Sequence, residues 1–360
     1  MHNLIEKIGG KISARERLSP EDALFLFTET PLDFLSNRSS DVRKEKWGNT
    51  VTFVLDTNPN YTNLCDCHCR FCAFYRRPGE AGAFTLSIEQ VVERVGKAVK
   101  AGVTTVLMQG GCNPDLPLQY YFDLVKSLGK AFPKLHLHLF SPPEIIAMAR
   151  AGKISVREIL QQLQAFGLKT VPGGGAEILV DKVRQAISPR KCSAAEWLNV
   201  MEEAHSLGFK TTATMVYGLG ESALDRVAHL KALRDLQDKT GGFTAFIPWS
   251  FKSGNTKLTV AAEPVPGVGY FRILAVARLF LDNFPHIQAS WFSEGKRIGQ
   301  LGLLFGADDF GGTLFEEHVL KTAGHDVRSG VDEVKELIRG AGMIPARRNT
   351  NYQIQEVCTK

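Results

Sequence analysis

Short β-branched or apolar runs alternate with longer amphipathic stretches from residue 50 onward. The runs that predict strands are 51–55, 104–108, 136–140, 168–171, 211–217, 243–247, 287–291 and 302–305. Most are followed by a stretch with helical periodicity, at 87–101, 117–131, 194–207, 223–238 and 270–281. Strands that alternate with helices favour a parallel sheet. Eight such units predict an α/β fold, a closed (β/α)8 barrel of the TIM type.

The chain outside this rhythm is short. Residues 1–49 predict a helical preface, residues 50–325 the barrel, and residues 326–360 a C-terminal extension packed on the barrel. A helix is expected to begin at Ser19-Pro20, because an N-cap serine precedes a proline and two acidic residues. The segment 345–350 is a candidate to fold back over the barrel mouth.

The composition is that of an ordinary globular protein. Of 360 residues, 44% are hydrophobic and 22% charged, which excludes a disordered chain. The net charge of +5 is small and the basic residues are not clustered, so nucleic acid is not an expected partner. No apolar run reaches the roughly 18 residues that span a bilayer. The N-terminus has no signal-peptide core, so we expect a cytoplasmic protein without a membrane partner.

Polar and glycine-rich segments follow nearly every predicted strand. They lie at 109–111, 141–144, 172–177, 218–221 and 306–312. The catalytic groups of TIM-type barrels stand at the C-terminal ends of the strands. The pattern therefore predicts an enzyme whose site is built from these segments.

Four of the seven cysteines lie between positions 65 and 72. Cys65, Cys69 and Cys72 form a C-x3-C-x2-C pattern, and thiolates are the usual protein ligands of iron–sulfur clusters. Three ligands on a four-iron cluster leave one iron open for a substrate or cofactor. Structural zinc on Cys69 and Cys72 would need a second pair, whereas the cysteines at 112, 192 and 358 are isolated. Cys67 is predicted not to be a ligand.

At these residues the chain resembles the radical S-adenosylmethionine superfamily, whose cysteine signature follows the first barrel strand. The resemblance implies a [4Fe-4S] cluster held by Cys65, Cys69 and Cys72. It also implies that S-adenosylmethionine chelates the open iron and is cleaved to a 5′-deoxyadenosyl radical. Outside enzymes, the alternative is an iron–sulfur electron carrier, which three-cysteine ligation disfavours.

The same resemblance implies contacts with S-adenosylmethionine. Gln109-Gly110-Gly111 stands where the superfamily has a GGE-like motif for the methionyl amine, with Cys112 in place of the glutamate. The segment 214–221 resembles the motif near the adenine and departs from it at positions 214 and 216. Helix capping alone could explain Ser141 and Glu144. The expected cofactor contacts are Tyr61, Gln109, Gly110, Gly111, Ser141, Glu144, Glu177, Arg184, Val216 and Glu221.

A narrower resemblance covers most of the chain from about residue 50. The stretches 60–76, 140–145, 172–179, 241–251, 254–256 and 305–313 are similar to the menaquinone-biosynthesis radical enzymes of the futalosine route and to relatives that make the deazaflavin chromophore. Ile247-Pro248-Trp249 followed by Gly254-Asn255-Thr256 favours the cyclase of that route. The aminofutalosine-forming and deazaflavin-forming enzymes stay open as alternatives.

The cyclase resemblance implies a substrate, a reaction and a partner. The substrate is dehypoxanthine futalosine, a ribose joined through a ketone to a carboxylated benzene ring. The deoxyadenosyl radical takes the C4′ hydrogen of the ribose, and the carbon radical closes a ring onto the benzene. The implied electron donor is a protein such as flavodoxin or ferredoxin.

The last step of that reaction releases a proton and needs an acceptor. Asp308 and Asp309 follow the eighth predicted strand at the catalytic face, and they either supply the general base or fix the loop. His136 and His138 alternate with leucines and are expected to point into the barrel, with His138 nearer the catalytic end. Glu316 and Glu317 rank below the two aspartates as candidates for the base, and a capping box over 313–316 explains Glu316 without chemistry. Candidates for orienting the substrate carboxylate are Arg297, Arg347 and Arg348.

Overall fold

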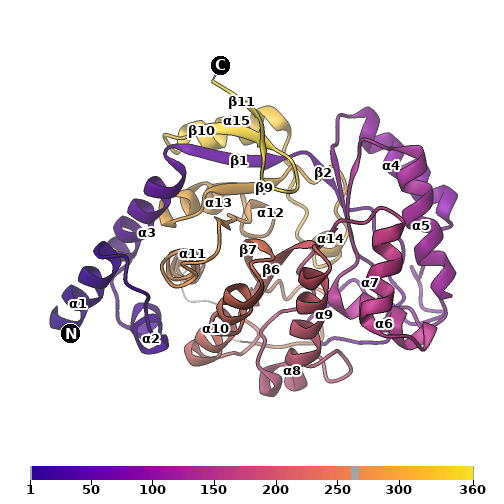
Figure 1. Cartoon of the computed structure of the whole chain (residues 1–360), viewed down its shortest axis with the longest axis horizontal. Helices are drawn as coiled ribbons and strands as arrows, with labels where there is room; N and C mark the ends of the chain where they lie inside the picture. The colour runs from indigo at the N-terminus through magenta and orange to yellow at the C-terminus, as the bar shows by residue number, and fades with distance from the viewer. Residues whose placement is uncertain (1, 261–266, 360) are drawn as a thin grey trace.

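Seven parallel strands stand side by side in chain order in the computed structural model, which describes residues 2–260 and 267–359 (Figure 1). All neighbouring pairs in this sheet are parallel. The strands are β2 (Asp56–Thr57), β3 (Thr105–Met108), β4 (His136–Leu139), β5 (Thr170–Val171), β6 (Lys210–Tyr217), β7 (Phe243–Ser250) and β8 (His286–Ile287).

A second sheet completes the ring of strands. Its order is β11-β10-β1-β9, formed by β1 (Thr50–Val54), β9 (Asp309–Gly312), β10 (Ile344–Arg348) and β11 (Ile354–Val357). One residue separates β1 from β2, and β1 pairs with β9. Gln288, just after β8, forms a parallel bridge with Asp309 of β9. The predicted α/β barrel is therefore confirmed.

The eighth predicted strand is wrong in position. Residues 302–305 end helix α13 (Lys296–Gly302) and form the 3-10 turn η1 (Leu303–Phe305). Gly306, at φ +93°, then redirects the chain in a conformation that favours glycine. The strand comes later, at β9, where two glycines give little intrinsic strand preference. It forms because β1 and the end of β8 offer pairing partners on both sides.

The five predicted barrel helices are confirmed at α4, α5, α9, α10 and α11. Ser87, Ser193 and Ser222 precede α4, α9 and α10 and form reciprocal capping boxes, which fix where these helices start. The helices and strands alternate around the barrel (Figure 1). The helices after β2 are α4 (Ile88–Lys100), α5 (Leu118–Ala131), α6 (Pro142–Gly152), α7 (Val156–Ala165), α8 (Asp181–Ile187), α9 (Ala194–Ser206), α10 (Ala223–Thr240), α11 (Val268–Phe280), α12 (Trp291–Glu294), α13, α14 (Val319–Thr322) and α15 (Val331–Gly340).

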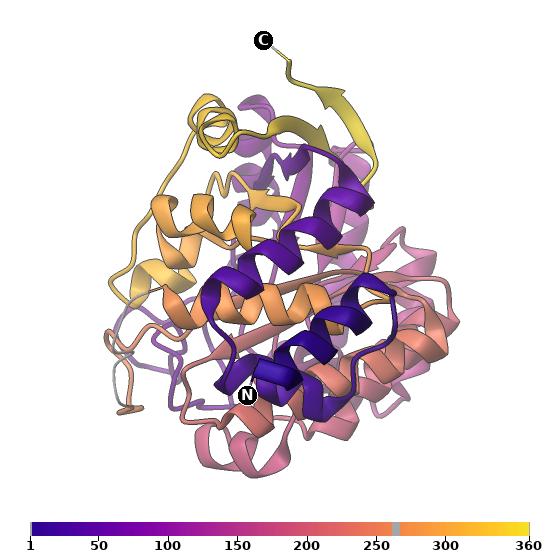
Figure 2. The same ribbon diagram turned by 90° about the vertical axis from the view of Figure 1, so that its left-hand side faces the viewer.

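Three N-terminal helices lie on one side of the barrel, where the second packs against α10 and α11 and the third packs against α11 (Figure 2). They are α1 (His2–Ser13), α2 (Pro20–Thr28) and α3 (Leu32–Trp47). The predicted helix start at Ser19-Pro20 is confirmed, and Ser19 and Asp22 form a capping box there. Arg272 of α11 donates hydrogen bonds to the carbonyls of Leu26 and Thr30, at 2.8 and 2.7 Å. Among the described helices, none is long and apolar enough to cross a membrane.

The C-terminal segment closes the bottom of the barrel, so the expectation that it covers the mouth is wrong. Strand β10 extends the second sheet beside β1. Beyond it, the Thr350 hydroxyl lies 2.8 Å from that of Thr105, the first residue of β3. The ring of Tyr352 stacks on His286, the first residue of β8, with centroids 4.2 Å apart. Residues 350 and 352 therefore lie at the N-terminal ends of β3 and β8. The chain after β10 reaches this level because β10 runs parallel to β1, and β3 begins beside Asp56, just after β1 ends.

Candidate active site

The loop after β2 carries the cysteine pattern to the C-terminal end of the barrel. Cys65, Cys67, Cys69 and Cys72 line one cavity, which we call the cluster cavity, together with Cys112 from the loop after β3. The walls also include predicted cofactor contacts that follow or end four other strands. These residues are Gln109, Gly110, Gly111, Ser141, Glu177 and Val216.

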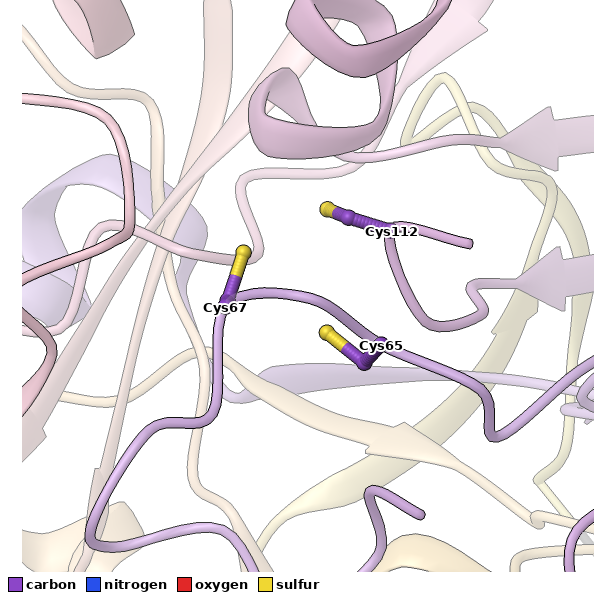
Figure 3. A group of neighbouring side chains, drawn as sticks. All are labelled: Cys65, Cys67 and Cys112. Atoms are coloured by element: carbon purple, nitrogen blue, oxygen red, sulfur yellow. The ribbon is translucent and has the colours of Figure 1, made fainter. Parts of the chain in front are cut away.

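The thiols of the cluster cavity fall into two groups. The sulfur atoms of Cys65, Cys67 and Cys112 lie within 4.8 Å of one another (Figure 3). Cys69 and Cys72 line the same cavity outside that group. Hydrogen bonds from Cys112 and Cys67 lower the pKa of the Cys65 thiol, whereas burial raises the pKa of Cys69 and Cys72. Cys65 is therefore the thiol that ionises most readily in this cavity.

Tyr61 and Glu144, two of the predicted cofactor contacts, are buried and are not among the residues that line the cluster cavity. The Tyr61 hydroxyl donates to Glu144 Oε1 at 2.6 Å, and the Gly110 amide donates to the same oxygen at 2.9 Å. Glu144 also accepts from Ser141, which confirms the expected capping box. Burial raises the pKa of both Tyr61 and Glu144. This buried network holds the loops after β2, β3 and β4 together.

A half-buried cation that the sequence did not reveal lines the same cavity as the cysteines. Lys191 Nζ donates to Glu177 Oε1 at 2.8 Å, and both residues line the cluster cavity. Burial opposes the charge on Lys191, but Glu177 raises its pKa well above the usual value. Arg184, one of the predicted cofactor contacts, does not line the cavity, but its Nη1 pairs with Glu177 Oε2 at 3.7 Å. Its guanidinium donates to the backbone carbonyls of Gly175, Ala176 and Cys192, so it braces the loop after β5.

The segment 214–221, which resembles the motif near the adenine, contains two predicted cofactor contacts with different positions in the structure. Val216, near the end of β6, lines the cluster cavity. Glu221 does not, because its carboxylate accepts hydrogen bonds from the amides of Gly218 and Leu219, at 2.9 and 2.8 Å. It also pairs with Arg226 at 2.7 Å. Glu221 therefore shapes the turn after β6.

A second cavity, which we call the barrel cavity, runs down the inside of the barrel. It shares Gln109, Gly174, Trp249, Val319 and Leu320 with the cluster cavity, so the two cavities adjoin. Much of its wall is apolar and aromatic. The lining residues that provide this character include Val54, Leu107, Ile247, Trp249 and Phe292.

The polar groups of the barrel cavity include His138, as predicted, and Asp56, Glu317 and Arg348. His138 Nδ1 lies 2.8 Å from the Thr170 hydroxyl, and burial lowers the His138 pKa to about 3. Burial raises the pKa of Asp56 to about 6, and it also raises that of Glu317. Among the three candidate arginines, Arg348 lines this cavity, while Arg297 is exposed and Arg347 pairs with Glu356 at 3.2 Å.

Asp308 and Asp309 do not lie at the catalytic face, which corrects their predicted position. They stand at the start of β9, because residues 302–305 are not the eighth strand. Asp308 pairs with Arg278 and, at 2.6 Å, with His286. Burial alone would raise the pKa of Asp308, but Arg278 and His286 hold it below its usual value. Asp309 pairs with Arg348 of β10. Both carboxylates therefore stabilise the bottom of the barrel.

Helix α14 covers the point where the two cavities adjoin. The predicted capping box over 313–316 is wrong, because α14 begins at Val319 and Leu314 has a φ of +47°. The Glu317 carboxylate caps this helix instead, accepting from the Val319 amide at 2.7 Å. The Asn255 side chain donates to the carbonyl of Thr322 at 2.9 Å. The Gly254-Asn255-Thr256 motif therefore helps to hold α14 over the cavities.

Asp56, Glu317 and Lys191 are the lining residues that the sequence-based prediction missed or undervalued. Asp56 follows the first predicted strand directly, so the strand-end rule could have found it. Glu317 stands beside the wrongly predicted capping box. Lys191 lies within Arg190-Lys191-Cys192, and no local pattern distinguishes it from a solvated surface lysine.

The barrel brings five thiols and glycine-rich loops together at the C-terminal ends of its strands. This arrangement defines a class of iron–sulfur enzyme. The radical SAM superfamily model matches residues 60–233, and the model of the CofH/MqnC C-terminal region matches residues 240–360. Solved structures that share the fold include the FeFe-hydrogenase maturase HydG from Carboxydothermus hydrogenoformans, with a TM-score of 0.75 and 16% identity over 97% of this chain and 80% of HydG. They also include methylornithine synthase, PylB, with a TM-score of 0.73 and 18% identity over 94% of this chain and 97% of PylB.

Curated relatives align with nearly the whole chain. Cyclic dehypoxanthine futalosine synthase of Halalkalibacterium halodurans is 42% identical over 341 residues, covering 94% of this chain and 92% of the relative. The synthase of the same name from Streptomyces coelicolor is 40% identical, covering 97% of this chain and 88% of the relative. A 5-amino-6-(D-ribitylamino)uracil–L-tyrosine 4-hydroxyphenyl transferase of Methanosarcina mazei is also 40% identical, covering 94% of this chain and 91% of the relative. The chain belongs to the radical S-adenosylmethionine superfamily, in the family that unites these enzymes. Its cofactors are a [4Fe-4S] cluster and S-adenosylmethionine.

Proposed function

We propose that the chain is a cyclase that converts dehypoxanthine futalosine into cyclic dehypoxanthine futalosine in menaquinone biosynthesis. The observation that carries the proposal is the alignment of two cyclic dehypoxanthine futalosine synthases, at 42% and 40% identity, over almost the full chain. In the proposed reaction the C4′ hydrogen of the ribose is removed and the ring closes onto the carboxylated benzene. Loss of one electron and one proton restores the aromatic system.

The cluster cavity suits the two cofactors in its donor chemistry. We infer that Cys65, Cys69 and Cys72 hold the cluster, and that the 109–111 loop and Glu177 face S-adenosylmethionine. One buried oxygen of the lining residues, Asn60 Oδ1, accepts no hydrogen bond from any described residue, which favours a polar ligand. When bound, the cofactors supply a 5′-deoxyadenosyl radical. An external low-potential protein such as flavodoxin or ferredoxin would supply the electron.

The barrel cavity is the proposed substrate site. Its walls present the indole of Trp249 and the ring of Phe292 to an aromatic substrate, and Gln288 supplies a polar contact. Because it adjoins the cluster cavity at Gln109 and Gly174, a ribose placed there lies next to the cofactor. The barrel walls exclude water from the reacting carbon, which protects a radical from side reactions.

Asp56 is the proposed proton acceptor for the final step. Its carboxylate lines the barrel cavity and accepts a hydrogen bond from the Leu314 amide at 2.8 Å. Burial raises its pKa to about 6, which is close to the value a general base needs near neutral pH. Asp56 replaces Asp308 and Asp309 in this role, because their carboxylates are committed to Arg278 and Arg348.

The second candidate function is the reaction named for the M. mazei transferase. The identity to that relative, 40%, equals the identity to the S. coelicolor synthase, so sequence similarity alone separates the two poorly. Both candidates share the barrel and the cluster cavity. They differ in substrate, so an assay must separate them.

The test is an anaerobic assay of the reconstituted and reduced enzyme with S-adenosylmethionine. 5′-Deoxyadenosine is measured with dehypoxanthine futalosine, with 5-amino-6-(D-ribitylamino)uracil plus tyrosine, and with neither. We expect deoxyadenosine and a product lighter by two hydrogens with dehypoxanthine futalosine. Turnover confined to the uracil and tyrosine pair would support the transferase. Absence of substrate-dependent deoxyadenosine from a fully iron-loaded enzyme would refute both candidates.

Cluster ligation is tested by iron content. We expect Cys69→Ala to lose most of its iron after reconstitution, because one of three ligands is removed. Cys67→Ala should keep about four irons per chain, as expected for a [4Fe-4S] cluster without this ligand. Cys192→Ala, which removes a buried thiol outside the cluster cavity, is the folding control. Equal iron loss in the Cys67 and Cys69 variants would contradict the assignment.

A further inference from the structure

Two thiols of the cluster cavity, Cys67 and Cys112, have no part in the proposed function. Each lies close to Cys65, and the three sulfur atoms are within 4.8 Å of one another. Figure 3 shows Cys65 and Cys67 on one loop and Cys112 on another, with the three sulfurs near one another. We call these residues the thiol trio. It joins the loops that follow two neighbouring strands, β2 and β3.

The spacing of the trio suits one metal ion. Tetrahedral zinc binds thiolate sulfur at about 2.3 Å, which places its sulfur ligands about 3.8 Å from one another. The sulfurs of the trio, at no more than 4.8 Å, reach such spacing by small side-chain rotations. Cys67 is buried and the other two members are half-buried, so the trio is shielded from bulk solvent while the cavity gives an ion access.

The backbone fixes Cys112 against the cysteine loop. The Gly111 amide donates to the Thr62 carbonyl, and the Asp66 amide donates to the Cys112 carbonyl, both at 3.0 Å. A Cβ at position 111 would lie 2.0 Å from the Leu64 carbonyl oxygen, so a side chain there would push the loops apart. The approach of Cys112 is therefore a property of the two loops, which is the preorganisation that a metal site requires.

We propose that Cys65, Cys67 and Cys112 form a site for a single thiophilic cation, with Zn²⁺ as the probe and a small ligand such as water in the fourth position. Binding releases the thiol protons, because thiolates are the metal ligands. Cys65 belongs to this site and, according to the proposed function, to the iron–sulfur cluster. The full chain therefore holds either the single ion or the cluster, and zinc competes with cluster assembly.

The experiment is a Zn²⁺ titration of the full-length, iron-free, reduced chain under anaerobic conditions, followed with a competing chromophoric chelator. We expect one ion per chain. Cys67→Ser and Cys112→Ser should each weaken binding at least about 100-fold, since even changes outside the ligand shell cost 10–100-fold. Cys69→Ser and Cys192→Ser are the matched controls and should bind as the wild type does. Loss of zinc binding in the Cys69 variant, together with retained zinc binding in the Cys67 variant, would overturn the assignment of the site to the thiol trio.

Alkylation of the wild-type chain provides a measurement that needs no variant to fold. With one equivalent of Zn²⁺, iodoacetamide should be excluded from Cys65, Cys67 and Cys112, while Cys69 and Cys72 keep their reactivity. Protection of Cys69 and Cys72 in place of Cys67 and Cys112 would assign the zinc to the cluster motif and overturn the proposal.

Exclusivity is tested on the holoenzyme. The chain carrying its four-iron cluster should take up no Zn²⁺, and one equivalent of Zn²⁺ added before reconstitution should lower iron incorporation at least about tenfold in the wild type. A Cys67→Ser/Cys112→Ser variant should load iron equally with and without zinc. A holoenzyme that binds zinc beside a complete cluster would disprove the shared ligand. These readouts are independent of turnover, so they stand apart from any failure of the proposed function.

Discussion

At the scale of the residue, Asp56 sets the pH dependence that we expect. The carboxylate accepts the proposed proton only when ionised, and burial raises its pKa to about 6. The turnover number should therefore be constant above about pH 7 and fall about tenfold per unit below pH 6. Asp56→Asn keeps an acceptor for the Leu314 amide and removes the base, so it should lower turnover by about 100- to 10,000-fold.

The matched control is Glu317→Gln, which alters a second carboxylate of the barrel cavity. Glu317 accepts hydrogen bonds from the amides of Val319, Leu320 and Lys321, so its role is to cap α14. We expect the steep acid limb of the pH profile to persist in this variant. A limb that vanishes with Glu317→Gln and persists with Asp56→Asn would transfer the role of base to Glu317.

At the scale of the element, one buried ion pair joins β10 to β9. Arg348 Nη2 donates to Asp309 Oδ1 at 2.9 Å, and its Nε contacts the other carboxylate oxygen. Arg348→Met leaves the buried carboxylate of Asp309 without its cation, which should lower the free energy of unfolding by about 3–5 kcal/mol. Urea denaturation of the full chain measures the change.

Arg347 of the same strand provides the control for that prediction. It pairs with Glu356 at 3.2 Å, and both side chains are substantially exposed. Arg347→Met should therefore cost no more than about 1 kcal/mol. Adding Asp309→Asn to Arg348→Met should restore part of the loss, because no unpaired charge is then buried. Equal losses from the Arg347 and Arg348 variants would show that β10 is not held by the buried pair.

At the scale of the whole molecule, buried and half-buried histidines couple the fold to pH. Burial lowers the pKa of His136, His138, His205 and His229 to about 4, 3, 4 and 3. The unfolded chain takes up protons near the usual value of 6.5, whereas the folded chain does not. The contribution of these groups to the free energy of unfolding is therefore complete above about pH 6.5 and declines as the pH falls towards 3–4.

His229→Asn tests this linkage away from the candidate site. His229 is fully buried and accepts a hydrogen bond from the Leu179 amide at 2.9 Å, which the asparagine oxygen can also accept. Between pH 7 and pH 5 the variant should lose about 2 kcal/mol less unfolding free energy than the wild type. Urea midpoints at the two pH values give the comparison, and identical losses in both proteins would contradict it.

The sequence alone determined the features that depend on local or regular pattern. Alternation of apolar runs with amphipathic stretches located seven of the strands, since a barrel repeats one unit. Helical periodicity in the stretches that follow the strands located α4, α9 and α10, because an amphipathic helix repeats its apolar positions locally. The cysteine spacing and the glycine-rich segments after strands identified the superfamily and the face that carries its chemistry.

Tertiary structure alone decided the features that depend on pairing between distant segments. Strand β9 forms at two glycines because β1 and the end of β8 supply hydrogen bonds, and this shift placed Asp308 and Asp309 at the opposite end of the barrel. Arg184 donates to backbone carbonyls and pairs with Glu177 at 3.7 Å, while Lys191 donates to the other carboxylate oxygen of Glu177 at 2.8 Å. The sulfur atom of Cys112 lies within 4.8 Å of that of Cys65, although the two residues come from different loops. No local pattern encodes these contacts, because each partner is selected by the closure of the barrel.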